Sequence, residues 1–220
     1  ARMLSSNIAQ RGGRMGIIEI LGIAGSLSLL AGWRLYLTIL ATGTAMHFGW
    51  LPLPEHLASL KVLAEPWVLG VAAVGTIAEF FADKVAWVDS AWDAIHSFVR
   101  PLGGALLALA LVDASDPAWQ VVAFLLGGGG ALLSHGAKAT TRAVVNASPE
   151  PFSNIAVSAS EDVATGGLLA LAIAFPGLAI GIAIVLALAA VAVIWVLGRL
   201  LCNIRRAPRP APPAPPLSSD

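Results

Sequence analysis

Long apolar segments separated by short polar stretches dominate the chain. The segments span residues 16–49, 66–83, 101–113, 118–136, 156–175 and 178–201. A helix needs about 20 apolar residues to cross the hydrocarbon core of a bilayer. The last segment meets this length, and the third is too short to span unless the bilayer thins or neighbouring protein shields its ends. The pattern therefore predicts an all-α, polytopic membrane bundle of about six transmembrane helices, some short or broken.

The first segment is too long for one plain helix. Gly22, Gly25 and Gly32 weaken it before Trp33 and Arg34, because glycine is a poor helix former. We expect a kinked or broken helix here. A hairpin of two short helices is the alternative, and it would change the helix count.

Composition narrows the class of protein. Hydrophobic residues make up 57% of the 220 residues and charged residues 12%, with a mean hydropathy of +0.81. Soluble domains carry about 25% charged residues, so a chain of this size would bury its apolar surface in a lipid bilayer. The net charge is zero, and we therefore expect no nucleic-acid partner.

Basic residues predict the orientation. Six crossings with both termini inside leave only Lys61 in the outside loops and place eight basic residues inside: Lys84, Arg100, Lys138, Arg142, Arg199, Arg205, Arg206 and Arg209. This matches the excess of Lys and Arg in cytoplasmic loops. The prediction is a multi-pass membrane protein with cytoplasmic N and C termini.

Three regions follow from this organisation. Residues 1–14 are predicted to be a disordered leader or extension, residues 15–203 the transmembrane helical domain, and residues 204–220 a Pro-rich disordered cytoplasmic tail. An internal repeat is also indicated, because RPLGGALLALALV at 100–112 returns as VATGGLLALAIAF at 163–175. Repeated units around a central polar site recur in transporters.

Charged side chains inside apolar segments are the first candidates for a site, because lipid-exposed charges are costly. Arg34 has no charged neighbour in sequence, and we expect it to point into the bundle with Glu79 as its partner. Glu79 and Asp83 are four residues apart and share one helix face. The pair could bind a cation or carry a proton; ion pairing with nearby basic groups is the structural alternative.

A second candidate is the acidic stripe of Asp89, Asp93 and His96, which continues to Arg100. The stretch has the pattern of an amphipathic helix at the cytoplasmic surface. Its oxygen and nitrogen atoms could bind a divalent metal, whereas a solvated polar face is the simpler interpretation.

A basic stripe follows the four glycines at 127–130. His135, Lys138 and Arg142 lie at i, i+3 and i+7, where two cations and a histidine could hold a phosphate head group. We expect Lys138 or Arg142 to lie within ion-pair distance of Asp89 and Asp93. Glu161 and Asp162 open the fifth segment, where capping alone would explain them.

Four stretches together resemble a known family: GWRLYL (32–37), EFFADKVAWVDSAWDAIHSFVRP (79–101), HGAKATTRAVVNASPEPFSN (135–154) and SASEDVA (158–164). They are similar to the small bacterial membrane proteins of the domain of unknown function 4126 family, from about Met15 to about Leu200. The resemblance implies a compact multi-helix inner-membrane protein and supplies no activity.

The function that the sequence favours is a transporter or channel for a small ion or solute, with a small ion or an anionic solute as the possible partner. Its path would be lined by eight residues: Arg34, Glu79, Asp83, His135, Lys138, Arg142, Glu161 and Asp162. A structural or assembly protein without a site is one alternative. The other is a metal-dependent enzyme acting on phospholipid head groups, with a divalent cation at Asp89, Asp93 and His96. We favour a non-enzyme without a cofactor, embedded in the bilayer, and leave a homo-oligomer open.

Overall fold

The computed structural model describes residues 17–50, 61–110, 117–146 and 152–206, and within these ranges the protein is all-α without a strand. The helices are α2 (Ile17–Trp33), α3 (Leu35–His47), α4 (Pro66–Ala82), α5 (Ala86–Ala110), α6 (Pro117–Val145), α7 (Phe152–Ala174) and α8 (Pro176–Arg206). Three of them begin at a proline, which is favoured in the first helical turn because its missing N–H has no partner there in any case.

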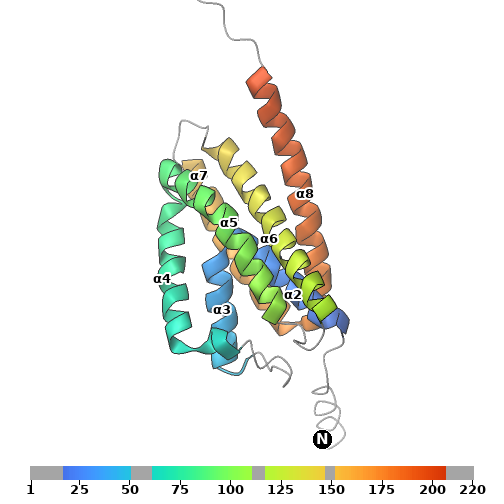
Figure 1. Cartoon of the computed structure of the whole chain (residues 1–220). Coiled ribbons are helices and arrows are strands. Elements are labelled where there is room, and N and C mark those ends of the chain that lie inside the picture. Colours follow the sequence, from blue (N-terminus) through green and yellow to red (C-terminus); the bar gives the residue numbers. More distant parts are fainter. Residues whose placement is uncertain (1–16, 51–60, 111–116, 147–151, 207–220) are drawn as a thin grey trace, which may run out of the picture.

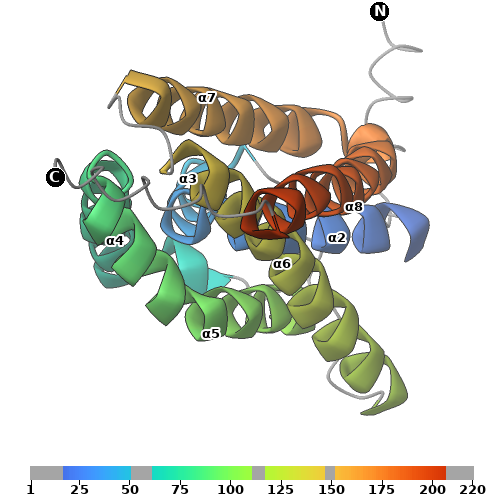
Figure 2. The ribbon, with the colours of Figure 1, turned by 90° about the horizontal axis from the view of Figure 1, so that it is seen from above.

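The helices form one bundle (Figure 1). From α4 onward, successive helices run in alternating directions, and α8 extends beyond the others at its C-terminal end. Seen from above, α7 lies along one side of the bundle and α5 along the other, with α6 and α8 between them (Figure 2). The C-terminal end of α4, the N-terminal ends of α5 and α7 and the C-terminal end of α6 therefore lie at one end of the bundle.

The first apolar segment is a hairpin of two helices that meet at Arg34. Arg34 has φ −139° and ψ 84° and precedes the first residue of α3. Helix α2 begins and α3 ends at the same end of the bundle (Figure 1). Of the two alternatives for this segment, the hairpin is correct, and the six-crossing count is not confirmed.

Small residues bring the helices of the hairpin close to their neighbours. A Cβ atom on Gly22 would lie 2.6 Å from the backbone nitrogen of Ile180 on α8, and one on Gly32 would lie 2.1 Å from the carbonyl oxygen of Ala131 on α6. The glycines that weaken the segment as a helix thus allow α2 to pack against α8 and α6 without intervening side chains.

The proposed repeat is not confirmed, because its two glycine pairs have different surroundings. Gly103 and Gly104 are packed: a Cβ on Gly104 would lie 2.5 Å from the Cβ of Ala131. A Cβ on Gly166 or Gly167 would meet nothing within 4 Å. Similar sequences therefore serve different contacts in α5 and α7.

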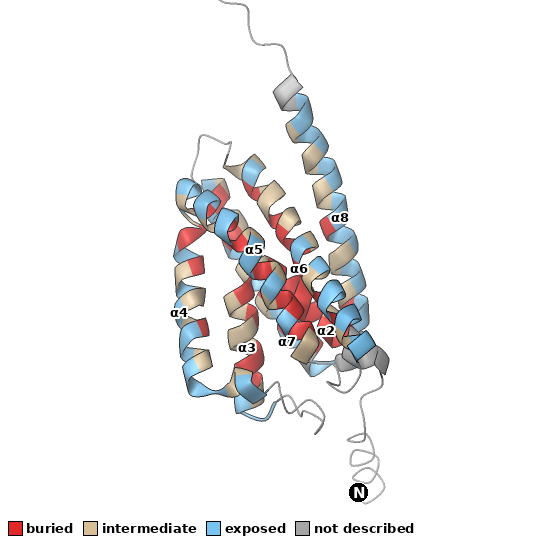
Figure 3. Cartoon of the chain, in the orientation of Figure 1, coloured by how far each residue is buried: buried red, intermediate tan, exposed pale blue. Residues whose placement is uncertain are grey.

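Many large apolar side chains are exposed on the bundle, and the buried residues lie toward its centre (Figure 3). The first half of α5 shows this most clearly, because Trp87 is 77% exposed and Phe98 82% exposed while Asp89 and Arg100 are fully buried. The polar stripe thus faces inward, and the solvated-face interpretation is wrong. An amphipathic helix with its apolar face outward is stable in lipid and not in water.

In the part of the chain that the structure describes, three helices are long and apolar enough to cross a membrane: Pro117–Val145, Phe152–Ala172 and Gly177–Asn203. The shorter apolar helices Gly22–Trp33 and Pro66–Ala82 accompany them. Length, composition and exposed surface together indicate a membrane protein. The predicted extension at 1–14 and most of the predicted tail at 204–220 lie outside the described residues.

Candidate functional site

Among the described residues, ten charged side chains from α4, α5, α6, α7 and the break between α2 and α3 meet inside the bundle. We call this group the ion cluster. Its cations are Arg34, Arg100, Lys138 and Arg142, and its carboxylates are Glu79, Asp83, Asp89, Asp93, Glu161 and Asp162. All four cations are at most 2% exposed. The cluster contains Glu161, Asp162 and every residue of the acidic and basic stripes except the two histidines. His96 and His135 lie beside it.

Helix geometry explains how residues so far apart in sequence converge. The break between α2 and α3 places Arg34 at the tip of the hairpin, and Asp83 is the C-cap residue of α4. The stripes of α5 and α6 repeat at helical spacing, so each presents one polar face. These two helices pack closely at Gly127, where an added Cβ would lie only 2.4 Å from the Cβ of Ala108. Glu161 and Asp162 face the cluster from α7.

Arg34 connects three acids on two helices. Its Nη1 donates to Asp83 Oδ2, and its Nη2 lies 3.3 Å from Glu161 Oε2 and 3.1 Å from Asp162 Oδ1. The same nitrogen donates to the carbonyl oxygen of Ser158 at 3.0 Å. The expectation that Arg34 points into the bundle is confirmed, but its predicted partner Glu79 is wrong.

Glu79 binds Arg100 instead. Arg100 Nη2 lies 2.6 Å from Glu79 Oε1, and Nη1 lies 2.9 Å from Asp93 Oδ1. Nη1 also donates to His135 Nδ1 at 2.6 Å. Because this ring nitrogen accepts, His135 is the neutral tautomer that carries its proton on Nε2, 3.0 Å from Ser97 Oγ.

Lys138 and Arg142 connect the acidic stripe to the rest of the cluster. Lys138 Nζ lies 2.9 Å from Asp83, 3.8 Å from Glu79 and 3.9 Å from Asp93. Arg142 lies 2.6 Å from Glu161 through Nη2 and 3.9 Å from Asp89 through Nε. The predicted pairing between the acidic and basic stripes is confirmed.

Carboxylates outnumber cations in this cluster by six to four, which gives a formal charge of −2 when all ten groups are ionised. Five carboxylate oxygens are buried without a hydrogen-bond partner among the described residues: Glu79 Oε2, Asp83 Oδ1, Asp89 Oδ1, Asp93 Oδ2 and Asp162 Oδ2. The Nε atoms of the three arginines of the cluster are likewise buried without a hydrogen-bond partner among the described residues. Buried polar atoms are normally satisfied by protein or water, so these oxygens could accept a proton, a water or a cation.

A family described as a domain of unknown function, DUF4126, matches residues 21–196, which include the whole ion cluster. The chain belongs to this family. No curated protein and no solved structure matches it. The function of this DUF4126 protein therefore has to be argued from its own geometry.

The metal hypothesis has little geometric support in the DUF4126 protein. His96 lies beside Tyr36 and Trp92: its Nδ1 is 2.8 Å from the carbonyl oxygen of Trp92 and its Nε2 is 3.2 Å from the hydroxyl of Tyr36. Within the described ranges, no group of three His, Cys, Asp or Glu residues is placed to hold a metal ion. A divalent cation at Asp89, Asp93 and His96 stays a prediction.

Asp89 and Asp93 line a cavity of about 270 Å³ together with Arg142 and Asn146. Asp89 lies in the first turn of α5, outside the three helices that are long enough to cross a membrane. Burial raises the pKa of Asp89 to about 6, although the hydrogen bond from Asn146 and the charge of Arg142 act in the opposite direction. This carboxyl therefore holds a proton more readily than an exposed aspartate.

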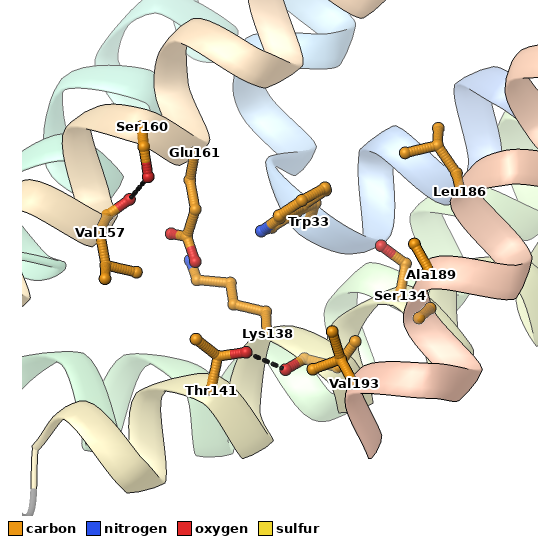
Figure 4. A pocket seen from close by; sticks show the side chains of 12 residues that line it. Trp33, Ser134, Lys138, Thr141, Val157, Ser160, Glu161, Leu186, Ala189 and Val193 are labelled. Carbon is orange, nitrogen blue, oxygen red and sulfur yellow. Dashed lines mark hydrogen bonds between the residues drawn. The ribbon is translucent and has the colours of Figure 1, made fainter. Parts of the chain in front are cut away.

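A second cavity, of about 220 Å³, lies between α2, α6, α7 and α8. Figure 4 shows the carboxylate of Glu161 and the indole nitrogen of Trp33 directed into it, with the side chain of Lys138 crossing beside them. Leu186 and Val193 form part of an apolar wall on α8. The cavity thus joins the ion cluster to an apolar surface.

Several residues of the site were not predicted as candidates. Arg100 was recognised only as the end of the acidic stripe, although its position seven residues after Asp93 places both on one face. Asn146, Asn154 and Ser158 supply further hydrogen bonds to the cluster. Polar residues at helical spacing on α7, such as Asn154, Ser158 and Glu161, were the available signal.

Proposed function

We propose that this protein is a membrane transporter or channel for a small ion, in which the ion cluster binds the transported proton or cation. The observation that carries the proposal is the excess negative charge of a buried cluster whose carboxylates keep unpartnered oxygens. Removing a charge from water costs several kcal/mol even after relaxation. Bound protons or a cation would offset the formal charge of −2 and satisfy these oxygens.

The broken hairpin supports the same proposal. Discontinuous helices in transporters place their ends at binding sites near the middle of the membrane, and irregular backbone is tolerated there only where protein or a water-filled cavity surrounds it. Arg34, at the break between α2 and α3, is 1% exposed and forms ion pairs with α7 and with the end of α4. The break thus lies at the ion cluster.

Transport is tested in proteoliposomes that contain a pH-sensitive dye, with an imposed potassium diffusion potential. We expect proton flux from the wild-type protein and a loss of about tenfold or more from Glu79→Gln, which removes one acid without changing its shape. Glu65→Gln is the matched control, because Glu65 is exposed and forms no ion pair within the described residues. Separate vesicles without the imposed potassium potential, loaded with sodium or potassium indicators, distinguish cation transport from proton transport.

Absence of flux for protons and common cations in the wild type would contradict the proposal. Normal flux from a folded Glu79→Gln protein would exclude Glu79 from the path. Circular dichroism and gel filtration show whether the variant is folded. Both results would favour the structural alternative, in which the cluster only joins the helices.

That structural alternative has one observation of its own. Each of the four cations forms at least two ion pairs, and together they join α4, α5, α6, α7 and the start of α3. A closed network of this kind would hold the helix ends in register. It does not explain why the carboxylates outnumber the cations.

The proposed topology places the cluster end of the bundle on the cytoplasmic side of the bacterial inner membrane. Helices α4 to α8 would cross the membrane, and the α4–α5 connection with the first turn of α5 would lie outside the hydrocarbon region on the cytoplasmic side. The α2–α3 hairpin would enter and leave from the opposite side, so the start of α2 would lie outside, in contrast to the cytoplasmic N terminus that the sequence predicts. In a protein whose exposed Cys202 is replaced by serine, we expect a cysteine at Lys61 to react with an impermeant maleimide outside spheroplasts. A cysteine at Lys84 should react only after lysis. Labelling of Lys84→Cys in intact spheroplasts would overturn this orientation.

A further inference from the structure

The cavity between α2, α6, α7 and α8 combines hydrogen-bond acceptors on one side with an apolar wall on the other. Glu161 is 4% exposed, and its carboxylate points into the cavity (Figure 4). Its Oε2 receives Arg142 Nη2 at 2.6 Å and Arg34 Nη2 at 3.3 Å. A carboxylate has lone pairs for further donors, so Glu161 could bind a donor group from a ligand.

Two hydroxyl groups at the cavity keep lone pairs that can accept. Thr141 Oγ1 donates to the carbonyl oxygen of Ala137 at 3.0 Å, and Ser160 Oγ donates to that of Val157 at 2.8 Å. Each hydroxyl hydrogen is thus used within its own helix, and the remaining lone pairs can only accept. A ligand in this cavity would therefore meet acceptors on both α6 and α7.

Lys138 does not make the cavity favourable for an anion. Its methylene chain lines the space, but its Nζ lies within 4 Å of Asp83, Glu79 and Asp93. The cluster behind Glu161 carries the formal charge of −2 described above. Electrostatics at this wall therefore favour a cationic ligand over an anionic one.

Trp33 supplies a donor that lacks a partner at this cavity. Its indole Nε1 is buried without a hydrogen-bond partner among the described residues, and it points toward Glu161 (Figure 4). An indole nitrogen can only donate, so it requires an acceptor atom such as a hydroxyl oxygen. Leaving this N–H unpaired is unfavourable, because a buried donor without a partner has lost its hydrogen bond to water.

The opposite wall is apolar and consists of α8 side chains, among them Leu186, Ala190 and Val193. The cavity volume is about 220 Å³, which equals about seven waters at roughly 30 Å³ each. A ligand of this size has room for a short alkyl chain in addition to two polar groups.

We infer that this cavity binds a small organic ammonium ion that carries a neighbouring hydroxyl group and a short alkyl chain. The ammonium group donates to Glu161 and the hydroxyls of Thr141 and Ser160, the ligand hydroxyl accepts from Trp33 Nε1, and the alkyl chain packs on α8. Its role as a transported solute rests on the proposed function, whereas its binding does not.

Binding is measured by calorimetry on the full chain in lipid nanodiscs, with the heat from empty nanodiscs subtracted. The probe is 1-amino-2-pentanol, compared with pentylammonium, 2-hexanol and 2-hydroxypentanoate. We expect saturable 1:1 binding of the amino alcohol, about tenfold or more tighter than 2-hexanol or the hydroxy acid, and a severalfold loss with pentylammonium. Equal binding of 2-hexanol would overturn the inference.

Variants assign the binding to this cavity. Val193→Phe should fill the space and weaken binding about tenfold or more, whereas Leu188→Phe on the exposed side of α8 should leave it unchanged. Trp33→Phe should remove the preference for the hydroxyl group while the ammonium preference remains. Unchanged binding to a folded Val193→Phe protein would overturn the inference.

The two proposals fail separately. Binding that depends on Val193 in a protein without ion flux would overturn transport and leave the ligand site in place. Flux that depends on Glu79 without any binding of the amino alcohol would do the reverse.

Discussion

Two regions of this bundle are held together by opposite means. At one end, the ion cluster joins α4, α5, α6 and α7 through charged side chains that are almost completely buried. Toward the other end, α2, α5, α6 and α8 meet through glycine and alanine, and Ile23, Leu27, Leu30, Leu169 and Ala179 form an apolar core. Charge pairing holds the helices together in the first region, and close packing of small side chains holds them together in the second.

The difference teaches what each region tolerates. In lipid, apolar burial provides little driving force between helices, and close packing of small residues replaces it. A small-residue contact is therefore sensitive to one added methyl group but indifferent to pH. The cluster has the opposite sensitivity, because removing one charge leaves its partners buried and uncompensated.

The largest effect is expected from Asp83→Asn. Asp83 contacts Arg34, Lys138 and Arg142, so its loss leaves three buried cations with one acid fewer. Breaking a buried ion pair costs about 3–5 kcal/mol. We expect a large fall in the thermal unfolding midpoint in detergent, and little change from Glu65→Gln. A midpoint within 2 °C of wild type, roughly the shift from less than 1 kcal/mol, would show that the cluster does not stabilise the bundle.

Second in size is the effect of one methyl group at Gly127. A Cβ there would lie 2.4 Å from the Cβ of Ala108 and 2.6 Å from the carbonyl oxygen of Gly104, whereas a Cβ on Gly129 would meet nothing within 4 Å. Overpacking costs about 1–3 kcal/mol. Gly127→Ala should lower the unfolding midpoint and Gly129→Ala should not. Equal midpoints for the two variants would contradict close α5–α6 packing.

Sequence reasoning predicted the residues of the ion cluster better than its connections. A charged residue in an apolar segment has to face protein or water, which is why Arg34, Glu79 and Asp83 could be selected from the sequence. The partner of Arg34 depends on the direction in which the chain leaves the break. Glycines indicate that a break exists but not its angle, so Asp83 could not be distinguished from Glu79.

The fold was predictable to a similar depth. The lengths of the apolar segments indicate a helical membrane protein. The composition of residues 16–49, however, does not distinguish a broken helix that crosses the membrane from a hairpin that returns to the side it entered. Its direction is set by the packing of Gly22 on α8 and Gly32 on α6. The acidic stripe of α5 was interpreted as solvated because the pattern of an amphipathic helix does not state which medium surrounds it. The basic stripe of α6 was the signal for burial.

The third expected effect, smaller than the first two, is the interaction energy between two contacting residues of the ion cluster. Glu79 and Arg100 are in contact at 2.6 Å, so Glu79→Gln and Arg100→Gln should not be additive. Contacting residues show interaction energies of about 0.5–3 kcal/mol. We expect the double variant to be more stable than the sum of the single losses predicts, as measured by the shift in unfolding midpoint. The pair Glu79 and Glu65 serves as the control, because Glu65 belongs to no cluster contact. Additive losses for Glu79 and Arg100 would mean that the two side chains act independently.

The smallest expected effect is a pH dependence of stability, which the ion cluster should show and the small-residue region should not. The pKa of Asp89 is raised to about 6 by burial from an ordinary value of 3.8, so the folded chain holds this proton more tightly than the unfolded chain. Stability must then fall as the pH rises from about 4 to about 7, because the unfolded state releases the proton first. Asp89→Asn removes this titration while the amide oxygen can still accept from Asn146, which donates to Asp89 at 2.9 Å. Relative to wild type, Asp89→Asn should gain about 2–4 °C in unfolding midpoint between pH 5 and pH 7.5, the shift that about 1 kcal/mol produces in a chain of this size. Gly127→Ala, in the small-residue region, should show the same loss at both pH values. A constant difference between Asp89→Asn and wild type across this range would mean that Asp89 does not titrate there.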